Sequence, residues 1–281
     1  MKTVADAFEL ARSNLIERAK KTSQGQKPYR KSEDAHVLPP IRELVDARPT
    51  YGYRRITALV NRRLMEAGKP RVNHKRIFRI MRRHGLLLQR YTGNRPNRAH
   101  DGVVRTLRSN TRWCSDGFEI SCWNGEIVRV AFVLDTCDRE AITWSASTAG
   151  LSGEMVRDMM LLAVERRFGG CQTPHRVEFL ADNGSGYTAH ETIDFGYAIG
   201  LMPCFTPVRS PESNGMAESF VKTFKRDYVR CNPRPDARTV LSRLDSWFED
   251  YNESHPHRGL KMLSPREFIR ANSSLAACPV S

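Results

Sequence analysis

The chain has 281 residues, of which 40% are hydrophobic, enough to build a sizeable core in one large domain or, as we expect, in two. It carries a formal net charge of +14, has no run of eighteen apolar residues, and lacks an apolar signal-peptide stretch near the N-terminus. We therefore exclude membrane and secreted proteins and expect a soluble one. The seven cysteines form no Cys-x-x-Cys pair, so reduced thiols are the simplest interpretation.

The first predicted element is a helix over residues 4–20. Its pattern fits either a plain amphipathic helix or the second half of a helix-turn-helix. Residues 22–34 are polar and have the composition of a linker. We therefore assign residues 1–35 to a helical N-terminal segment with its linker.

The positive charge is concentrated in residues 51–100, which hold fourteen Lys or Arg residues and a single acid, Glu66. Each cation that neutralises a phosphate releases a condensed counterion, so a block of this kind favours a polyanionic partner. A face that is merely solvated has no need to exclude acids so completely. We therefore expect this part of the chain to bind nucleic acid.

Within this block the apolar residues recur at helical spacing and predict two short helices. The first covers residues 53–68, and the second begins after Asn73, which can cap it. The residues expected to face inward are Ile56, Leu59, Val60, Leu64, Ile77, Ile80 and Met81. The pair suits a helix-turn-helix-like domain over residues 36–91 whose second helix enters a major groove. A basic hairpin that only grips phosphates is the alternative.

Six basic side chains of this all-α region are expected to face outward and contact DNA. They are Arg55, Lys75, Arg76, Arg79, Arg82 and Arg83.

A different pattern begins after a second polar linker over residues 92–111. Apolar runs and turn signals predict, in order, three strands, a helix, a strand, a helix and a strand, over residues 113–123, 126–138, 141–149, 153–168, 177–184, 190–200 and 202–207. Long helices follow from residue 215. This order predicts an α/β domain with a mixed sheet over residues 112–252, followed by a C-terminal tail over residues 253–281.

Three acids occupy positions where α/β domains gather polar groups for chemistry. Asp116 lies in the first strand, and Asp182 lies where a later strand meets a turn. Glu218 lies in the first turn of a helix that Ser213 and Asn214 are placed to cap. Each acid alone has an ordinary explanation, such as a turn aspartate or a helix-dipole contact. The three together, with 35 residues between the second and the third, are harder to explain structurally.

This arrangement resembles the acidic triad of the retroviral-integrase superfamily. The segment SPESNGMAESFVKTFKRDY (210–228) and the segment YNESHPHRGLKMLSPREF (251–268) look like parts of the orfB-type transposases of bacterial insertion sequences. The YGYRRI…VNHKRIFRIMRRHGLL block (51–87) resembles the helix-turn-helix that precedes the core in those proteins. The resemblance covers about residues 40–270 and implies an RNase H-like core.

The resemblance implies that Asp116, Asp182 and Glu218 are the catalytic, metal-binding residues. All-oxygen ligand sets suit Mg²⁺, or Mn²⁺ in vitro, and two ions are expected. The resemblance further assigns Lys225 to DNA contact, and Lys222, on the same helix face, is expected to hold the strand being cut.

The implied activity is metal-dependent cleavage of the element ends, followed by transfer of the 3′-OH into target DNA. A metal-dependent RNase H-like nuclease, or a DNA-binding regulator with an inactive core, is the alternative. The implied partners are double-stranded DNA, further copies of the chain, and an upstream-frame product or a fusion with it. The expected location is the bacterial cytoplasm, at the nucleoid.

Two departures from the pattern of many relatives concern details of the subgroup. Phe118 stands where many have Thr, and His255 stands where many have Arg before the Pro-His pair. The chain has no His and Cys spacing that matches the zinc-binding N-terminal domain of retroviral integrases, so no structural zinc is expected.

Overall fold

The computed structural model describes residues 34–89, 106–205 and 215–276, with side chains described through residue 273. The helix expected over residues 4–20, most of the second linker, and the Ser213–Asn214 cap lie outside the described residues. In the described parts of the chain, no helix combines the length and the apolar character needed to cross a lipid bilayer.

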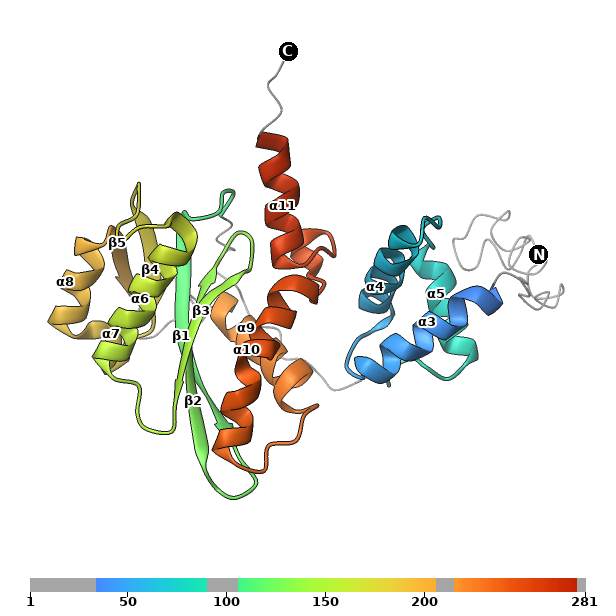
Figure 1. Ribbon diagram of the computed structural model, residues 1–281, viewed down its shortest axis with the longest axis horizontal. Coiled ribbons are helices and arrows are strands. Elements are labelled where there is room, and N and C mark those ends of the chain that lie inside the picture. The colour runs from blue at the N-terminus through green and yellow to red at the C-terminus, as the bar shows by residue number, and fades with distance from the viewer. Residues whose placement is uncertain (1–33, 90–105, 206–214, 277–281) are drawn as a thin grey trace, which may run out of the picture.

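Three helices form the N-terminal domain: α3 (Asp34–Ala47), α4 (Tyr53–Glu66) and α5 (His74–Arg83) (Figure 1). Their apolar faces meet in one cluster that includes Ile41 and the inward-facing residues expected from the sequence. The predicted cap is confirmed, because the Asn73 side chain accepts a hydrogen bond from the Lys75 amide at 2.8 Å. Helix α3 was not predicted, since Pro39 and Pro40 inside it resemble a helix break.

The second domain contains a five-stranded mixed sheet with the order β3-β2-β1-β4-β5. The strands are β1 (Arg112–Ser121), β2 (Ile127–Asp135), β3 (Ala141–Ser147), β4 (Val177–Ala181) and β5 (Leu201–Phe205). The first three pair antiparallel, whereas β4 runs parallel to both β1 and β5. This is the mixed α/β sheet that the element order predicts, in the RNase H-like form that the resemblance implies.

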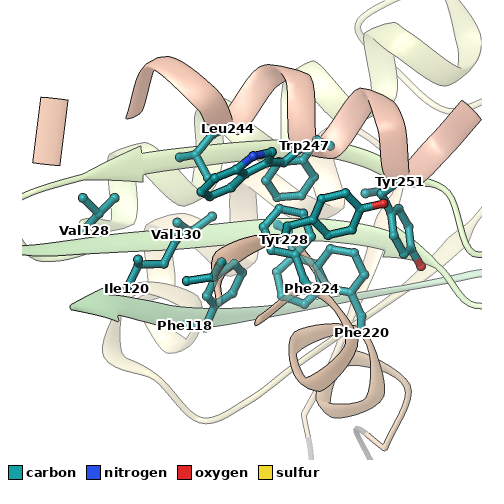
Figure 2. Close-up of a cluster of buried hydrophobic side chains, with 14 of the residues drawn as sticks. Phe118, Ile120, Val128, Val130, Phe220, Phe224, Tyr228, Leu244, Trp247 and Tyr251 are labelled. Atoms are coloured by element: carbon teal, nitrogen blue, oxygen red, sulfur yellow. The ribbon is translucent and has the colours of Figure 1, made fainter. Parts of the chain in front are cut away.

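Helices cover both faces of this sheet (Figure 1). On one face lie α6 (Gly153–Phe168), the short α7 (Ser185–Thr188) and α8 (His190–Ala198). On the other lie α9 (Gly215–Phe224), its π-helical continuation η2 (Lys225–Val229) and α10 (Ala237–Ser254). Figure 2 shows the aromatic core between that second face and its helices, where Phe224 of α9 packs against Phe118 of β1.

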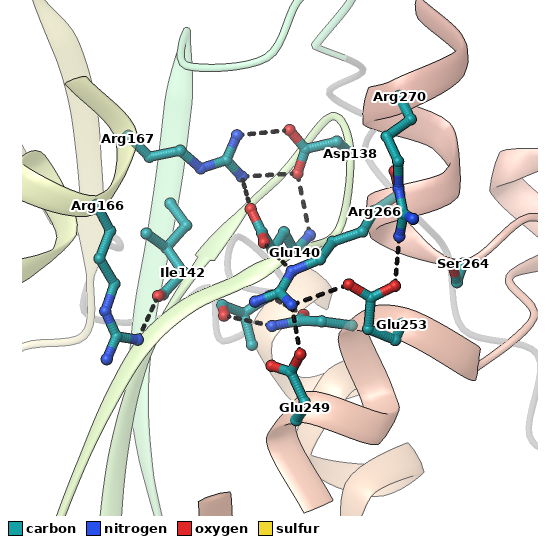
Figure 3. A network of polar contacts seen from close by, with 12 residues as sticks. Asp138, Glu140, Ile142, Arg166, Arg167, Glu249, Glu253, Ser264, Arg266 and Arg270 are labelled. Atoms are coloured by element: carbon teal, nitrogen blue, oxygen red, sulfur yellow. Dashed lines mark hydrogen bonds and ion pairs between the residues drawn. The ribbon is translucent and has the colours of Figure 1, made fainter. Parts of the chain in front are cut away.

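The segment expected as a C-terminal tail packs onto the core through a short 3₁₀ turn, η3 (Arg258–Leu260), and helix α11 (Pro265–Ala276). Arg266 of α11 pairs with Glu140 at 2.9 Å, Glu249 at 2.6 Å and Glu253 at 3.0 Å (Figure 3). These carboxylates come from the β2–β3 connection and from α10, so one guanidinium links the last helix to two parts of the core.

Polar contacts join the helical domain to the core. Arg48 donates to both carboxylate oxygens of Asp250, and the Tyr51 hydroxyl lies 2.7 Å from His255 Nδ1. Arg55 of α4 reaches Asp227, whose side chain is only 1% exposed. The two domains therefore share a partly buried polar interface.

Candidate active site

The sheet register brings the first two acids of the expected triad together. Strands β1 and β4 pair in parallel, with Cys114 opposite Leu180. Asp116 and Asp182 each follow two residues later, so alternation puts both at the same level and on the same face as that pair. Cys114 and Leu180 both contact the hydrophobic cluster under α9 and α10. Asp116 and Asp182 also line one cavity of about 300 Å³.

Asp116 responds electrostatically to both other acids. Burial raises its pKa to about 6, and the negative charges of Asp182 and Glu218 act in the same direction. The Gly117 amide, which donates to Asp116 Oδ1 at 2.7 Å, and the charge of Lys225 oppose that rise. The carboxylates of Asp182 and Glu218 are therefore close enough to destabilise the charged form of Asp116.

Glu218 is held by the amphipathic character of α9. Ala217, Phe220 and Phe224 are buried against the sheet, which leaves Glu218 at the edge of the helix. Its carboxylate accepts from Lys222 Nζ at 2.9 Å, an i,i+4 ion pair whose side chains are 38% and 70% exposed. An exposed pair of this kind contributes only about 0.3–0.5 kcal/mol, so a bound cation or phosphate can displace either partner.

Lys225 begins the π-helical turn that continues α9. Its ammonium lies 5.6 Å from the centre of the Phe118 ring, on the β1 side of the helix. Lys222 thus pairs with Glu218, and the charge of Lys225 acts on Asp116. The π-helical turn itself was not expected, and such turns are frequent at functional sites.

The loop after β4 is shaped around Asp182. The Gly184 amide donates to Asp182 Oδ1 at 3.1 Å, and a Cβ added at Gly184 would lie 3.0 Å from that same oxygen. Below the loop, the Tyr187 hydroxyl lies 2.7 Å from Ser115 Oγ, which donates to the Phe132 carbonyl. The sequence analysis did not identify Ser115 or Tyr187. The one sequence feature that could have pointed to this pair is a serine within an otherwise apolar strand.

The donor set suits a hard cation. Asp116, Asp182 and Glu218 offer only carboxylate oxygens, whereas burial raises the pKa of the neighbouring Cys114 thiol and keeps it protonated. Within the described residues, no three His, Cys, Asp or Glu side chains stand close enough to hold one ion as positioned. The Glu218 carboxylate is engaged by Lys222 instead.

The basic residues expected to contact DNA fall into two groups. Lys75, Arg79, Arg82 and Arg83 are exposed along α5. Arg76 donates to Asp34 at 2.7 Å and its side chain is only 20% exposed, so the prediction that it points into solvent is wrong. Arg55 points toward the core, where it meets Asp227 at 2.9 Å. Both acids are distant in sequence, which is why spacing alone could not reveal these pairs.

Comparisons with known proteins agree with this arrangement. Two families, each described as an integrase core domain, match residues 107–211 and 200–265, and a family described as an HTH-like domain matches residues 31–93. An uncharacterized protein of insertion element IS136 from Agrobacterium fabrum is 59% identical over 194 residues, which are 69% of this chain and all of that protein. The transposase InsD of insertion element IS2 from Escherichia coli is 52% identical over 242 residues, 86% of this chain and 80% of that one.

Solved structures of similar shape include a simian T-cell lymphotropic virus intasome, with 16% identity and a TM-score of 0.48 over 82% of this chain and 73% of that one. Another is the Mos1 transposase catalytic domain solved with Mg, with 19% identity and a TM-score of 0.42 over 59% of this chain and 83% of that one. The sequence matches carry the assignment: the chain belongs to the transposases of bacterial insertion elements, which are DNA-binding polynucleotidyl transferases with an integrase-type core.

Proposed function

We propose that this transposase cuts the ends of its own insertion element and joins the exposed 3′-OH to target DNA, using Asp116, Asp182 and Glu218. The observation that carries the proposal is the parallel register of β1 and β4, which sets two aspartates side by side on the face covered by the Glu218 helix.

The three carboxylates would hold Mg²⁺, with Mn²⁺ as a substitute, in a two-ion site. Two unit charges 4 Å apart repel by about 4 kcal/mol at an effective dielectric constant of 20, so converging acids favour a divalent counter-charge. Burial is the main cause of the raised pKa of Asp116, and the negative charges of Asp182 and Glu218 add to it. When bound, such ions polarise a phosphodiester and stabilise the attacking and leaving oxygens.

The protein's own contribution is to position the DNA strand. Lys222 is 70% exposed and, among the described residues, pairs with Glu218 alone, so a Glu218 side chain that turns toward the aspartates leaves Lys222 available to a backbone phosphate. Lys225 stands one turn further along. Phosphate contacts of this kind fix the register of the strand without reading its sequence. If Glu218 releases Lys222 to bind a metal ion, and Lys222 then binds a phosphate, metal binding would be coupled to strand binding.

Recognition of the element ends falls to α5. Its exposed Lys75, Arg79, Arg82 and Arg83 form a basic face suited to a major groove. Joining two ends to one target requires at least two protomers on DNA, so we propose that the chain acts as a multimer. Its substrates are then the bacterial chromosome and the element within it.

The decisive variant is Glu218→Gln, with Glu154→Gln as a matched control, because Glu154 also lies in the first turn of a helix but on the opposite face of the sheet. We expect Glu218→Gln to abolish nicking and joining of an element-end duplex in Mg²⁺ while binding that duplex as the wild type does. The control should cut normally. Normal cutting by Glu218→Gln would contradict the site assignment.

A precut duplex with a free 3′-OH separates the alternatives. Joining of that end by the wild type supports a transposase, whereas nicking without joining would identify a nuclease. Binding without either reaction in Mg²⁺ or Mn²⁺ would identify an inactive regulator.

A further inference from the structure

A second cavity, of about 310 Å³, borders α9 on the side of Ser219 and Thr223. Its other polar walls come from three separate parts of the chain: Arg55 of α4, Arg139 of the β2–β3 turn, and the pair His257–Arg258 that leads into η3. The cavity therefore exists only where the helical domain, the sheet and the C-terminal segment meet.

The cavity is cationic. Three arginines and one histidine line it together with the hydroxyl side chains of Ser219, Thr223 and Tyr251, and none of its lining residues is acidic. Among the described residues, neither Arg139 nor Arg258 forms an ion pair with a carboxylate. Asp227, the acid nearest to Arg55, has both oxygens engaged by Arg226 and Arg55. Arg139 and Arg258 thus bring positive charge to the cavity, whereas the charge of Arg55 is already paired with Asp227.

Two buried nitrogens of the lining residues have no hydrogen-bond partner among the described residues: Arg139 Nε and His257 Nε2. A buried polar group without a partner costs about 1–3 kcal/mol, which makes such groups informative about ligands. Burial, followed by the charges of Arg55 and Arg139, lowers the pKa of His257 to about 3. The histidine is therefore neutral and adds no charge of its own to the cavity.

The cavity shares its helix with the acidic site. Ser219 follows Glu218 directly, about 100° further around α9, so the two sites occupy neighbouring faces of one rigid element. Arg139 contacts the sulfur of Met216 in the first turn of the same helix. An anion in the cavity would be fixed relative to the group cut at Glu218.

We propose that this cavity is a second phosphodiester-binding site. One phosphate of the bound DNA would be cut beside Glu218, and the cavity would hold another backbone phosphate of the same DNA. The proposal rests on the proposed function, since DNA must approach along α9. The site would fix the angle of the DNA across the helix and would link DNA binding to the docking of the helical domain through Arg55.

The test compares Arg258→Gln and Arg139→Gln with Arg238→Gln. Arg258 is exposed, so its replacement leaves the core intact. Arg139 adopts a positive φ in its turn, so Arg258→Gln remains informative even if Arg139→Gln disturbs that turn. Arg238 is exposed at the start of α10, about 20 Å along that helix from Tyr251, which lines the cavity, and its replacement removes the same charge.

Binding of a labelled element-end duplex is measured without divalent metal at several salt concentrations. We expect the double variant to reduce the slope of log affinity against log salt by about 0.9, the value for one neutralised phosphate, and Arg258→Gln to reduce it by part of that amount. Arg238→Gln should keep the wild-type slope. Equal slopes for Arg258→Gln and the wild type would overturn the proposal.

Inorganic phosphate is the second probe. If 10 mM phosphate raises the melting temperature of the wild type but not of Arg258→Gln, while duplex binding is the same in both, the cavity takes free phosphate and the DNA proposal is wrong. Strand cutting by the wild type is scored in parallel. If the wild type cuts DNA but the variants keep its salt slope, the phosphate site is refuted and the proposed function is not. If the variants change the salt slope but the wild type does not cut, the proposed function is refuted and the phosphate site is not.

Discussion

Asp227 is the best point at which to test how the helical domain is held to the core. Its side chain is 1% exposed and accepts hydrogen bonds from Arg226 at 2.6 and 2.7 Å and from Arg55 at 2.9 Å. Nearby His255 is fully buried, and burial holds its pKa well below 6.5, so it adds no positive charge. Asp227→Asn removes the negative charge and keeps the shape.

The magnitude follows from the exposure of the partners. Removing one member of a buried ion pair costs about 3–5 kcal/mol, because the other charge stays desolvated. Arg226 is 45% exposed and can return to water, and Asn keeps one acceptor oxygen, so we expect a loss of about 2–3 kcal/mol. Adding Arg55→Ala in a double-mutant cycle should give a coupling of about 1–2 kcal/mol, since Arg55 is only 24% exposed.

Urea unfolding measures both quantities. All four tryptophans lie at or beyond residue 113, so fluorescence reports the core alone, whereas far-UV circular dichroism also reports the helical domain. We expect the two signals to separate in Asp227→Asn. Asp245→Asn, at an exposed position of α10, is the control and should stay within about 0.5 kcal/mol of the wild type. An unchanged midpoint in Asp227→Asn, or a coupling near zero, would refute a docking role for this network.

Three further predictions concern other parts of the molecule. Gly184→Ala should reduce strand cutting at least tenfold with little loss of stability, because the new Cβ displaces the Asp182 carboxylate; Gly170→Ala, where a Cβ meets open space, should cut normally. Between pH 7.5 and 5.5 the wild type should lose about 1 kcal/mol more stability than His255→Gln, since below 6.5 the unfolded chain binds a proton that the buried His255 does not; equal losses would contradict this. Asn73→Ala should destabilise the helical domain by about 1 kcal/mol in circular dichroism, and no change would mean that the cap contributes nothing.

The local elements could be predicted because short-range periodicity determines them. The strands β1 to β5 and the helices α4, α5 and α6 lie where the apolar spacing indicated, and the inward face of α5 was predicted residue by residue. Helix α3 was missed, since a Pro-Pro pair weakens the helical signal although tertiary packing of Ile41 and Leu44 stabilises the helix.

The sequence by itself determined the three acids, their spacing and the family, because residue type and order along the chain carry that information. Only the tertiary structure decided that the first two acids share one sheet face, since that depends on the pairing of β1 with β4. It also decided that Arg55 and Arg76 form ion pairs within the protein. Their acidic partners are 172 and 42 residues away along the chain, so the sequence spacing does not reveal these pairs. Long-range electrostatics depend on distances in space, which chain spacing does not contain.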